Sequence, residues 1–232
     1  MRVLVTRSQD DSRRTAKRLA QRGHEALIAP TTRIVPTGEP QPAGPFDAVI
    51  VTSAHAAEAL TAMAHKHWPV FAVGPHTALA AQRAGFHSVA AADGDARSLS
   101  GLIRGLPGIG RRLLHVTGRH HKAEPAESLR NAGFHVVSWE AYEAKGLDCL
   151  VPEAIEAIRT GQIGAALHYS RRSADIFLQL AGEAGLTSSV GNFPHLCLSA
   201  DVAAAFAGLG VTTVPSRRPD EEALLDLLDG LP

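Results

Sequence analysis

The chain has 232 residues, 45% of them hydrophobic, which suffices for one large or two small domains with ordinary apolar cores. Its 23 Lys and Arg residues balance 23 Asp and Glu residues, so net charge gives no indication of binding to nucleic acid or to an anionic membrane. The N-terminal residues are too charged for a signal-peptide core, and no segment is apolar enough to span a bilayer. We therefore expect a cytoplasmic protein.

Strands and helices alternate along the first half of the chain. Apolar runs predict strands at residues 2–6, 25–29, 48–51, 70–73 and 87–91, and helical patterns follow at 8–21, 54–60, 75–84 and 96–106. Five prolines and two glycines fall within residues 30–45. Such a segment cannot continue the interior of a sheet, so we interpret it as a linker or surface crossing.

The same pattern restarts in the second half. Strands are predicted at 113–117, at 135–139 leading to Tyr142, at 164–168 and at 194–198. Helices are predicted at 124–131, 171–180 and 201–209, and residues 142–161 contain a second crossing with a short helix.

Two strand-to-helix corners match each other and indicate an internal duplication. Ser53 in the first corner corresponds to Ser170 in the second, and Gly85 corresponds to Gly210. Alternating strands and helices predict parallel sheets with right-handed crossovers. We expect two α/β bodies that face each other across a cleft, one of residues 36–147 and one of residues 1–35 with 148–232.

Several short motifs together resemble the uroporphyrinogen-III synthase family. They are Val3-Leu4-Val5-Thr6-Arg7, Val51-Thr52-Ser53-Ala54-His55, Val73-Gly74-Pro75-His76-Thr77-Ala78, and the tyrosine that ends the strand after Phe134. The resemblance runs through the full chain and implies two flavodoxin-like domains, with helices on both faces of each parallel sheet, joined by a two-strand connection.

The resemblance also implies a reaction. Linear hydroxymethylbilane, a flexible small molecule with eight carboxylates, loses its hydroxyl and closes with inversion of ring D, whereas unassisted closure gives the uninverted isomer. The implied enzyme is a monomeric lyase of haem biosynthesis that needs no cofactor, and transient contact with hydroxymethylbilane synthase is left open. Its main tasks are to hold the reacting ends together and to donate a proton to the departing hydroxyl.

Tyr142 matches the family tyrosine proposed to assist loss of the hydroxyl, because a neutral phenol donates a hydrogen bond. The alternative is a tyrosine that only packs at the end of a strand. Ser53, Thr77 and Ser170 stand at predicted helix starts, where a substrate carboxylate can accept hydrogen bonds. Ordinary helix capping is the alternative there.

A set of turn residues follows predicted strand ends, the edge at which open α/β sheets bind ligands. We predict substrate binding by Arg7, Gly118, Arg119, His121, Lys122 and Arg171, with Arg172 as a further basic candidate, although a solvated surface explains any one of the basic side chains. The twelve histidines include no i, i+4 pair, and Cys149 and Cys197 lack metal or redox spacing, so no metal site is expected.

One departure from the family pattern affects the second repeat. Ser199 stands where Gly74 is in the first copy, and Val202 stands where Thr77 is, so this helix start loses a hydroxyl. Three other functions are compared with the sequence pattern. A noncatalytic tetrapyrrole-binding module stays open. A nucleotide-binding enzyme would need a glycine-rich turn after the first strand, which Thr6-Arg7-Ser8-Gln9-Asp10 lacks. A periplasmic binding protein would be expected to carry an export signal, and the N-terminal residues do not resemble one.

Overall fold

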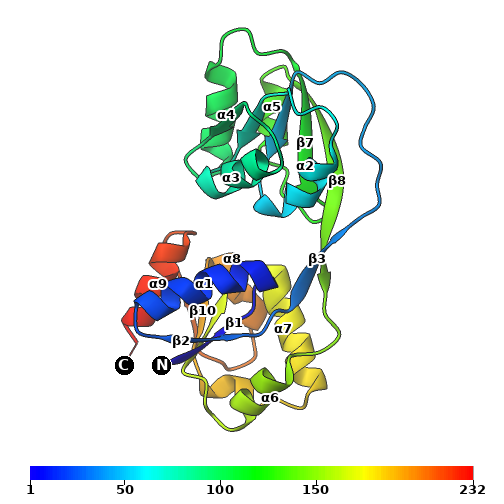
Figure 1. Cartoon of the computed structure of the whole chain (residues 1–232). Helices are drawn as coiled ribbons and strands as arrows, with labels where there is room; N and C mark the ends of the chain where they lie inside the picture. Colours follow the sequence, from blue (N-terminus) through cyan, green and yellow to red (C-terminus); the bar gives the residue numbers. More distant parts are fainter. Residues whose placement is uncertain (232) are drawn as a thin grey trace. The chain divides into compact units, whose positions relative to one another are not determined.

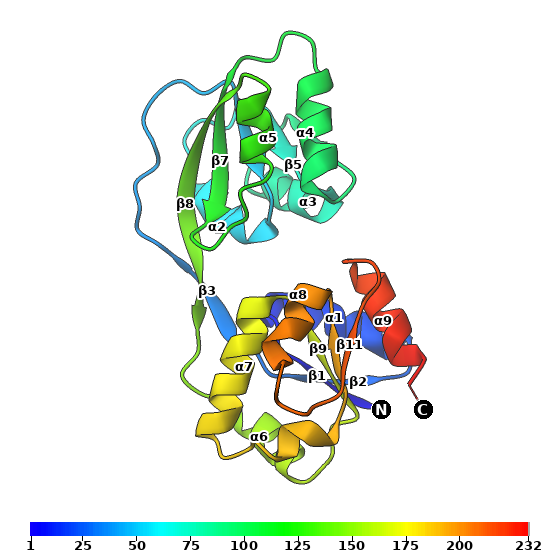
Figure 2. The same cartoon turned by 180° about the vertical axis from the view of Figure 1, so that it is seen from behind.

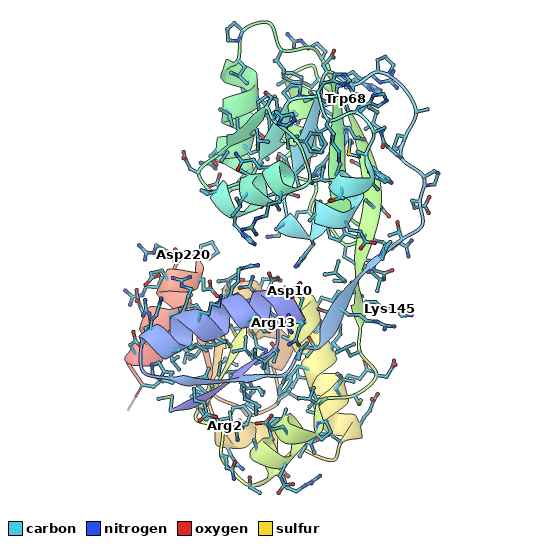
Figure 3. The ribbon with its side chains drawn as sticks, viewed as in Figure 1. Arg2, Asp10, Arg13, Trp68, Lys145 and Asp220 are labelled. Atoms are coloured by element: carbon cyan, nitrogen blue, oxygen red, sulfur yellow. The ribbon has the colours of Figure 1, made fainter. Side chains whose placement is uncertain are left out.

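The computed structural model describes residues 1–231, which form two compact units (Figure 1). Unit 1 joins Met1–Arg33 to the segment that starts at Lys145, and unit 2 is Ile34–Ala144. Lys145, labelled in Figure 3, is the point where the chain returns to unit 1. Each unit contains its own sheet and its own hydrophobic cores.

The sheet of unit 1 has five parallel strands in the order β11-β10-β9-β1-β2. Their bounds are β1 Arg2–Val5, β2 Glu25–Ile28, β9 Ala165–His168, β10 His195–Cys197 and β11 Thr213–Pro215. The helices are α1 Gln9–Gln21, α6 Pro152–Arg159, α7 Arg171–Glu183, α8 Ala200–Ala203 and α9 Glu221–Asp229, with one-turn helices η2 Ser189–Asn192 and η3 Ala204–Phe206.

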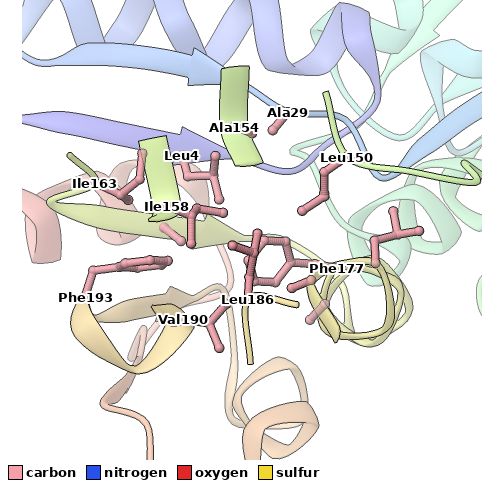
Figure 4. Packing of buried hydrophobic residues seen from close by; sticks show 14 of the residues in the cluster. Leu4, Ala29, Leu150, Ala154, Ile158, Ile163, Phe177, Leu186, Val190 and Phe193 are labelled. Atoms are coloured by element: carbon pink, nitrogen blue, oxygen red, sulfur yellow. The ribbon is translucent and has the colours of Figure 1, made fainter. Parts of the chain in front are cut away.

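Helices cover both faces of this sheet, which is why the runs Val3–Val5 of β1 and Ala165–Leu167 of β9 are apolar and fully buried (Figure 2). Leu19 of α1 and Leu224 of α9 pack on the face that carries Val3 and Val5. Phe177 of α7 packs with α6 and α8 on the opposite face, in the larger core shown in Figure 4.

The sheet of unit 2 has six strands in the order β3-β8-β7-β4-β5-β6. The strands are β3 Thr32–Pro36, β4 Ala48–Val51, β5 Val70–Ala72, β6 Val89–Ala91, β7 Arg112–Gly118 and β8 His135–Gly146. The helices are η1 Ala54–Ala56, α2 Ala57–Ala62, α3 Pro75–Arg83, α4 Ala96–Gly105 and α5 Ala126–Asn131. Leu60 of α2 and Ala81 of α3 pack on one face, and Leu99 of α4 and Leu129 of α5 pack on the other.

The two sheets share one spatial order. When β7, β8, β4, β5 and β6 are matched with β1, β2, β9, β10 and β11, both read 2-1-3-4-5, the flavodoxin-like doubly wound order. The predicted α/β fold class is therefore confirmed. The shared order fits the predicted duplication, which stays a prediction.

The proline-rich crossing was only partly predicted. Its first residues form β3, which lies at the sheet edge beside β8, where Pro36 at the end of the strand removes no interior hydrogen bond. The β8 strand also extends past the predicted residue 139 to Gly146. The helix expected at 201–209 is the short α8 followed by η3, and β11 and α9 were missed.

Candidate active site

Each unit has a switch point, where two neighbouring strands send their chains to opposite sides of the sheet. In unit 1 it lies between β1 and β9, and in unit 2 between β4 and β7. Ligands of open α/β sheets bind outside the carboxyl ends of such strands. Most of the predicted site residues follow these four strands directly, so each unit is described at its own switch point.

Tyr142 is positioned by a close contact with Gly118. A β-bulge in the β7–β8 ladder shifts the register by one residue after Thr117, so that Gly118 pairs with Tyr142 and not with Ala141. A Cβ atom at Gly118 would lie only 2.8 Å from Tyr142 Cε2, so glycine is the residue that lets the ring cross β7. The Arg119 N–H donates to the Tyr142 carbonyl at 2.9 Å and fixes the same register.

The phenol oxygen of Tyr142 is hydrogen bonded by the Ser53 side chain and the Gly118 backbone. Burial raises the pKa of Tyr142, and these two hydrogen bonds only partly offset the effect. The residue is therefore a neutral phenol near pH 7. A neutral phenol can donate a hydrogen bond to a ligand.

A pocket of about 200 Å³ lies beside this phenol and belongs entirely to unit 2. We call it the Tyr142 pocket. Its walls come from β3 and the residues after it, from η1 and α2, and from β8; they are Ile34, Pro36, Gly38, Glu39, His55, Glu58, Ala59, Ala62, Trp139, Ala141 and Tyr142. Trp139 is held there by its Nε1–H, which donates to the Glu39 carbonyl at 2.9 Å.

The basic residues in the loop after β7 differ in how far they are free to bind a substrate carboxylate. Arg119 pairs with Glu143 at 3.0 Å, so its charge is already matched. His121 donates from Nδ1 to the Gly118 carbonyl at 2.9 Å and so braces the turn beneath Tyr142. Lys122 is exposed beyond that turn.

In unit 1, Arg7 is built into a cluster of side chains and is not an open cation. Its guanidinium lies 4.0 Å from the ring centroid of Tyr169 and 3.1 Å from Glu221 Oε1. Tyr169 donates to the same carboxylate at 2.8 Å, and Thr15 does so at 2.6 Å. Burial opposes ionisation of Glu221, yet hydrogen bonds from Thr15, Tyr169 and Arg18 and the charge of Arg7 hold its pKa below the usual value.

The start of α7 is more open. The Arg171 side chain is 48% exposed, and its nearest carboxylates, Asp175 and Asp201, lie 3.9 Å away. Ser170 caps the helix, because its Oγ accepts from the Ser173 N–H at 3.1 Å. In Arg172, which is partly buried, Nη1 is enclosed without a hydrogen-bond partner.

Hydroxyls at the helix starts serve as caps in both units. Ser53 accepts from the His55 N–H at 3.2 Å, in addition to its bond to Tyr142. Thr77 is only 5% exposed, in the first turn of α3. In the matching helix α8, Ser199 supplies the cap by accepting from the Val202 N–H at 3.4 Å, and Val202 packs into the core of unit 1.

The structure thus brings Ser53, Gly118 and Tyr142 together, with Arg119 and His121 on the adjoining turn, while Thr77 and Lys122 do not line the Tyr142 pocket. The pocket residues His55, Glu39, Glu58 and Trp139 were missed as site residues. Only His55 carried a signal, because it stands two residues after Ser53 in the first corner motif.

Residues 1–231 contain neither a metal-binding cluster nor a membrane-spanning helix. No group of three or more His, Cys, Asp or Glu side chains is arranged to hold a metal ion. Across the same residues, no helix has both the length and the apolar character needed to cross a membrane.

Comparison with known proteins places the chain in a family. The family described as uroporphyrinogen-III synthase HemD matches residues 13–226. Uroporphyrinogen-III synthetase from Helicobacter pylori has a similar fold, with a TM-score of 0.66 at 17% identity and 100% of both chains covered. A mutant uroporphyrinogen III synthase from the extremely thermophilic bacterium Thermus thermophilus superposes with a TM-score of 0.49 at 19% identity, covering 99% of this chain and 96% of that chain. Comparison with curated protein sequences gave no significant match. Because the family match spans most of the sequence, this chain belongs to the uroporphyrinogen-III synthase family.

Proposed function

We propose that this enzyme closes hydroxymethylbilane to uroporphyrinogen III, with loss of water and inversion of ring D. Membership of the family supports a cyclisation in tetrapyrrole biosynthesis. The observation that carries the specific reaction is the neutral phenol of Tyr142, whose oxygen is held by Ser53 and Gly118 beside a pocket.

Tyr142 would donate a hydrogen bond to the departing hydroxyl. Its ring is packed closely on Gly118, so the phenol is positioned before the substrate arrives and little reorganisation is needed when charge develops. The pocket of about 200 Å³, with Trp139 and three alanines in its walls, suits one pyrrole ring. It would hold the ring that carries the hydroxymethyl group next to the phenol.

The substrate carboxylates would be bound by exposed cations and helix starts. Lys122 and Arg171 are the most open of the predicted basic residues. Arg7 and Arg119 would contribute only by sharing their charge with Glu221 and Glu143. We further propose that the enzyme acts as a cytoplasmic monomer. The reaction itself is redox-neutral.

The deciding experiment is an isomer-resolved product assay. Hydroxymethylbilane is generated in the reaction mixture, and the uroporphyrinogens are oxidised and separated chromatographically. We expect the type III isomer in large excess with the protein and the type I isomer without it. Type I alone in both samples would reject the proposed reaction, and binding of product without a change of isomer would identify a noncatalytic tetrapyrrole-binding module.

A further inference from the structure

His55 shares the Tyr142 pocket and lies edge-on to its phenol. The two ring centroids are 6.1 Å apart and the rings are nearly perpendicular, at 77°. His55 is half-buried on η1, and both rings line the same cavity of about 200 Å³. A small ligand in this pocket would therefore contact the phenol and the imidazole together.

The proposed reaction moves one proton in and one proton out. The carbon–oxygen bond of the hydroxymethyl group breaks, its electron pair stays on oxygen, and that oxygen needs a proton to leave as water. Inversion of the terminal pyrrole then exchanges its bonds: its substituted α-carbon bonds the methylene carbon that lost the hydroxyl, the bond from that α-carbon to its original bridging carbon breaks, and the bridging carbon bonds the free α-carbon, which releases a proton. No electrons are exchanged, so a single group that gives a proton and later recovers one balances the whole reaction.

Tyr142 is poorly suited to be that group. Burial raises its pKa, so full transfer of its proton would leave a phenolate in a site that disfavours the charge. It can polarise the departing hydroxyl by donating a hydrogen bond. A second side chain is then needed to transfer the proton, and imidazole is the side-chain type that does so most readily near neutral pH.

We propose that His55 supplies the proton to the departing hydroxyl and recovers it from the terminal pyrrole, an inference that rests on the proposed function. As imidazolium it protonates the leaving oxygen while Tyr142 holds that oxygen by a hydrogen bond. The neutral imidazole then accepts the proton released by the new carbon–carbon bond, which restores the starting state.

The charged surroundings within unit 2 permit this role. Glu58 on α2, Glu39 after β3 and Tyr142 on β8 are the other titratable groups that line the pocket, and no Lys or Arg lines it. The helix α3, which packs against η1, carries His76 in its first turn. A positive charge on His55 therefore meets carboxylates and no fixed cation in the pocket.

The test compares His55→Asn and His55→Gln with the parent enzyme in the type III assay across pH 5–9. For the parent, kcat should fall as pH rises and the imidazolium loses its proton. Each variant should lose about tenfold or more in kcat, show no such alkaline fall, and keep KM within about threefold. Tyr142→Phe should also be slow but should retain the alkaline fall.

The matched control is His87→Asn, since His87 is an exposed histidine of the same unit that lines no part of the pocket. It should keep both the rate and the pH profile of the parent. A second measurement uses His55→Ala with added imidazole, which should restore type III formation in proportion to its concentration. Rescue is read within one variant, so a folding defect cannot imitate it.

Two results separate this inference from the proposed function. If the parent forms no type III isomer, the proposed function itself fails. If the parent is active while the His55 variants keep kcat within about threefold and the parental pH profile, and imidazole gives no rescue, only the role of His55 is overturned.

Discussion

Gly118 and Tyr142 are packed so closely that a Cβ atom at Gly118 would approach the tyrosine ring to 2.8 Å. Gly118→Ala should therefore displace the ring from its bonds to Ser53 and Gly118, and lower kcat to a level near that of Tyr142→Phe. The crowding should also destabilise unit 2 by about 1–3 kcal/mol. Gly101→Ala is the control, because a Cβ on that α4 residue meets nothing within 4 Å. Unchanged activity in Gly118→Ala would show that the position of the phenol is unimportant.

Tyr142→Phe should retain the fold, because the phenyl ring still packs on Gly118. It removes the hydrogen-bond donor aimed at the departing hydroxyl, so kcat should fall by ~10²-fold or more, the usual effect of losing a preorganised donor to developing charge. The measurement is the initial rate of type III formation, with circular dichroism to confirm folding. Activity within about threefold of the parent would leave Tyr142 as a packing residue.

Buried histidines should make stability depend on pH. His168 Nε2 and His195 Nδ1 are 3.0 Å apart, and burial lowers the pKa of both. Burial also lowers the pKa of His115 to about 4. Below pH 6.5 these histidines are protonated in the unfolded chain but stay neutral in the folded protein. The free energy of unfolding should therefore fall as pH drops, by up to ~1.4 kcal/mol per pH unit for each histidine.

Urea denaturation between pH 7 and pH 4.5 measures this effect. The exposed variant His87→Asn should reproduce the slope of the parent. A free energy of unfolding that stays flat from pH 6.5 to pH 5 would mean that the buried histidines are protonated as easily as in the unfolded chain.

Glu221 should matter more than its neighbour on α9. Glu221→Gln weakens the acceptor shared by Arg7, Thr15 and Tyr169, and should cost about 1–3 kcal/mol of stability. The side chain of Glu222 is 55% exposed and pairs with Arg18 and Arg22 at the surface, so Glu222→Gln should cost below about 1 kcal/mol. If Glu221→Gln and Glu222→Gln lose the same stability in thermal or urea unfolding, Glu221 is not the main acceptor that holds α9 to its neighbours.

The two matching helix starts should respond differently to exchange of their side chains. Thr77→Val should weaken binding of reduced uroporphyrinogen III by about tenfold if the hydroxyl contacts a carboxylate. Val202→Thr should instead destabilise unit 1 by about 1–3 kcal/mol, because it buries a hydroxyl in the apolar core around α7. Titration measures the first effect and urea unfolding the second. No change of affinity in Thr77→Val would remove Thr77 from the site.

Most of the fold could be predicted because local signals agreed with the tertiary structure. The buried runs Val3–Val5 and Val49–Val51 are apolar at every position, as strands covered on both faces must be. The β11 strand has three residues, too few for any alternation to show. In contrast, α9 follows the capping residue Asp220 and has regular leucine spacing, so it could have been found.

The site was less predictable because it depends on register and on distant partners. Tyr142 was identified by resemblance, but only the β-bulge after Thr117 shows that its ring lies against Gly118. Arg7 follows a strand like any ligand-binding arginine, and nothing near it in sequence reveals that Glu221 already neutralises it. His55 becomes significant only when β8 brings Tyr142 beside it.

The central position of β1 has a consequence for how the chain folds during synthesis. Val3 pairs with Ala26 on one side and with Ala165 on the other, and β9 is translated only after the whole of unit 2. Until then the first residues offer a bare strand edge, and Leu19 has no Leu224 to cover it. Unit 2 is continuous in sequence and can fold as soon as it emerges. During synthesis, unit 2 is thus the first part of this protein that can fold, and the N-terminal segment of unit 1 can complete its sheet only after the C-terminal segment has been made.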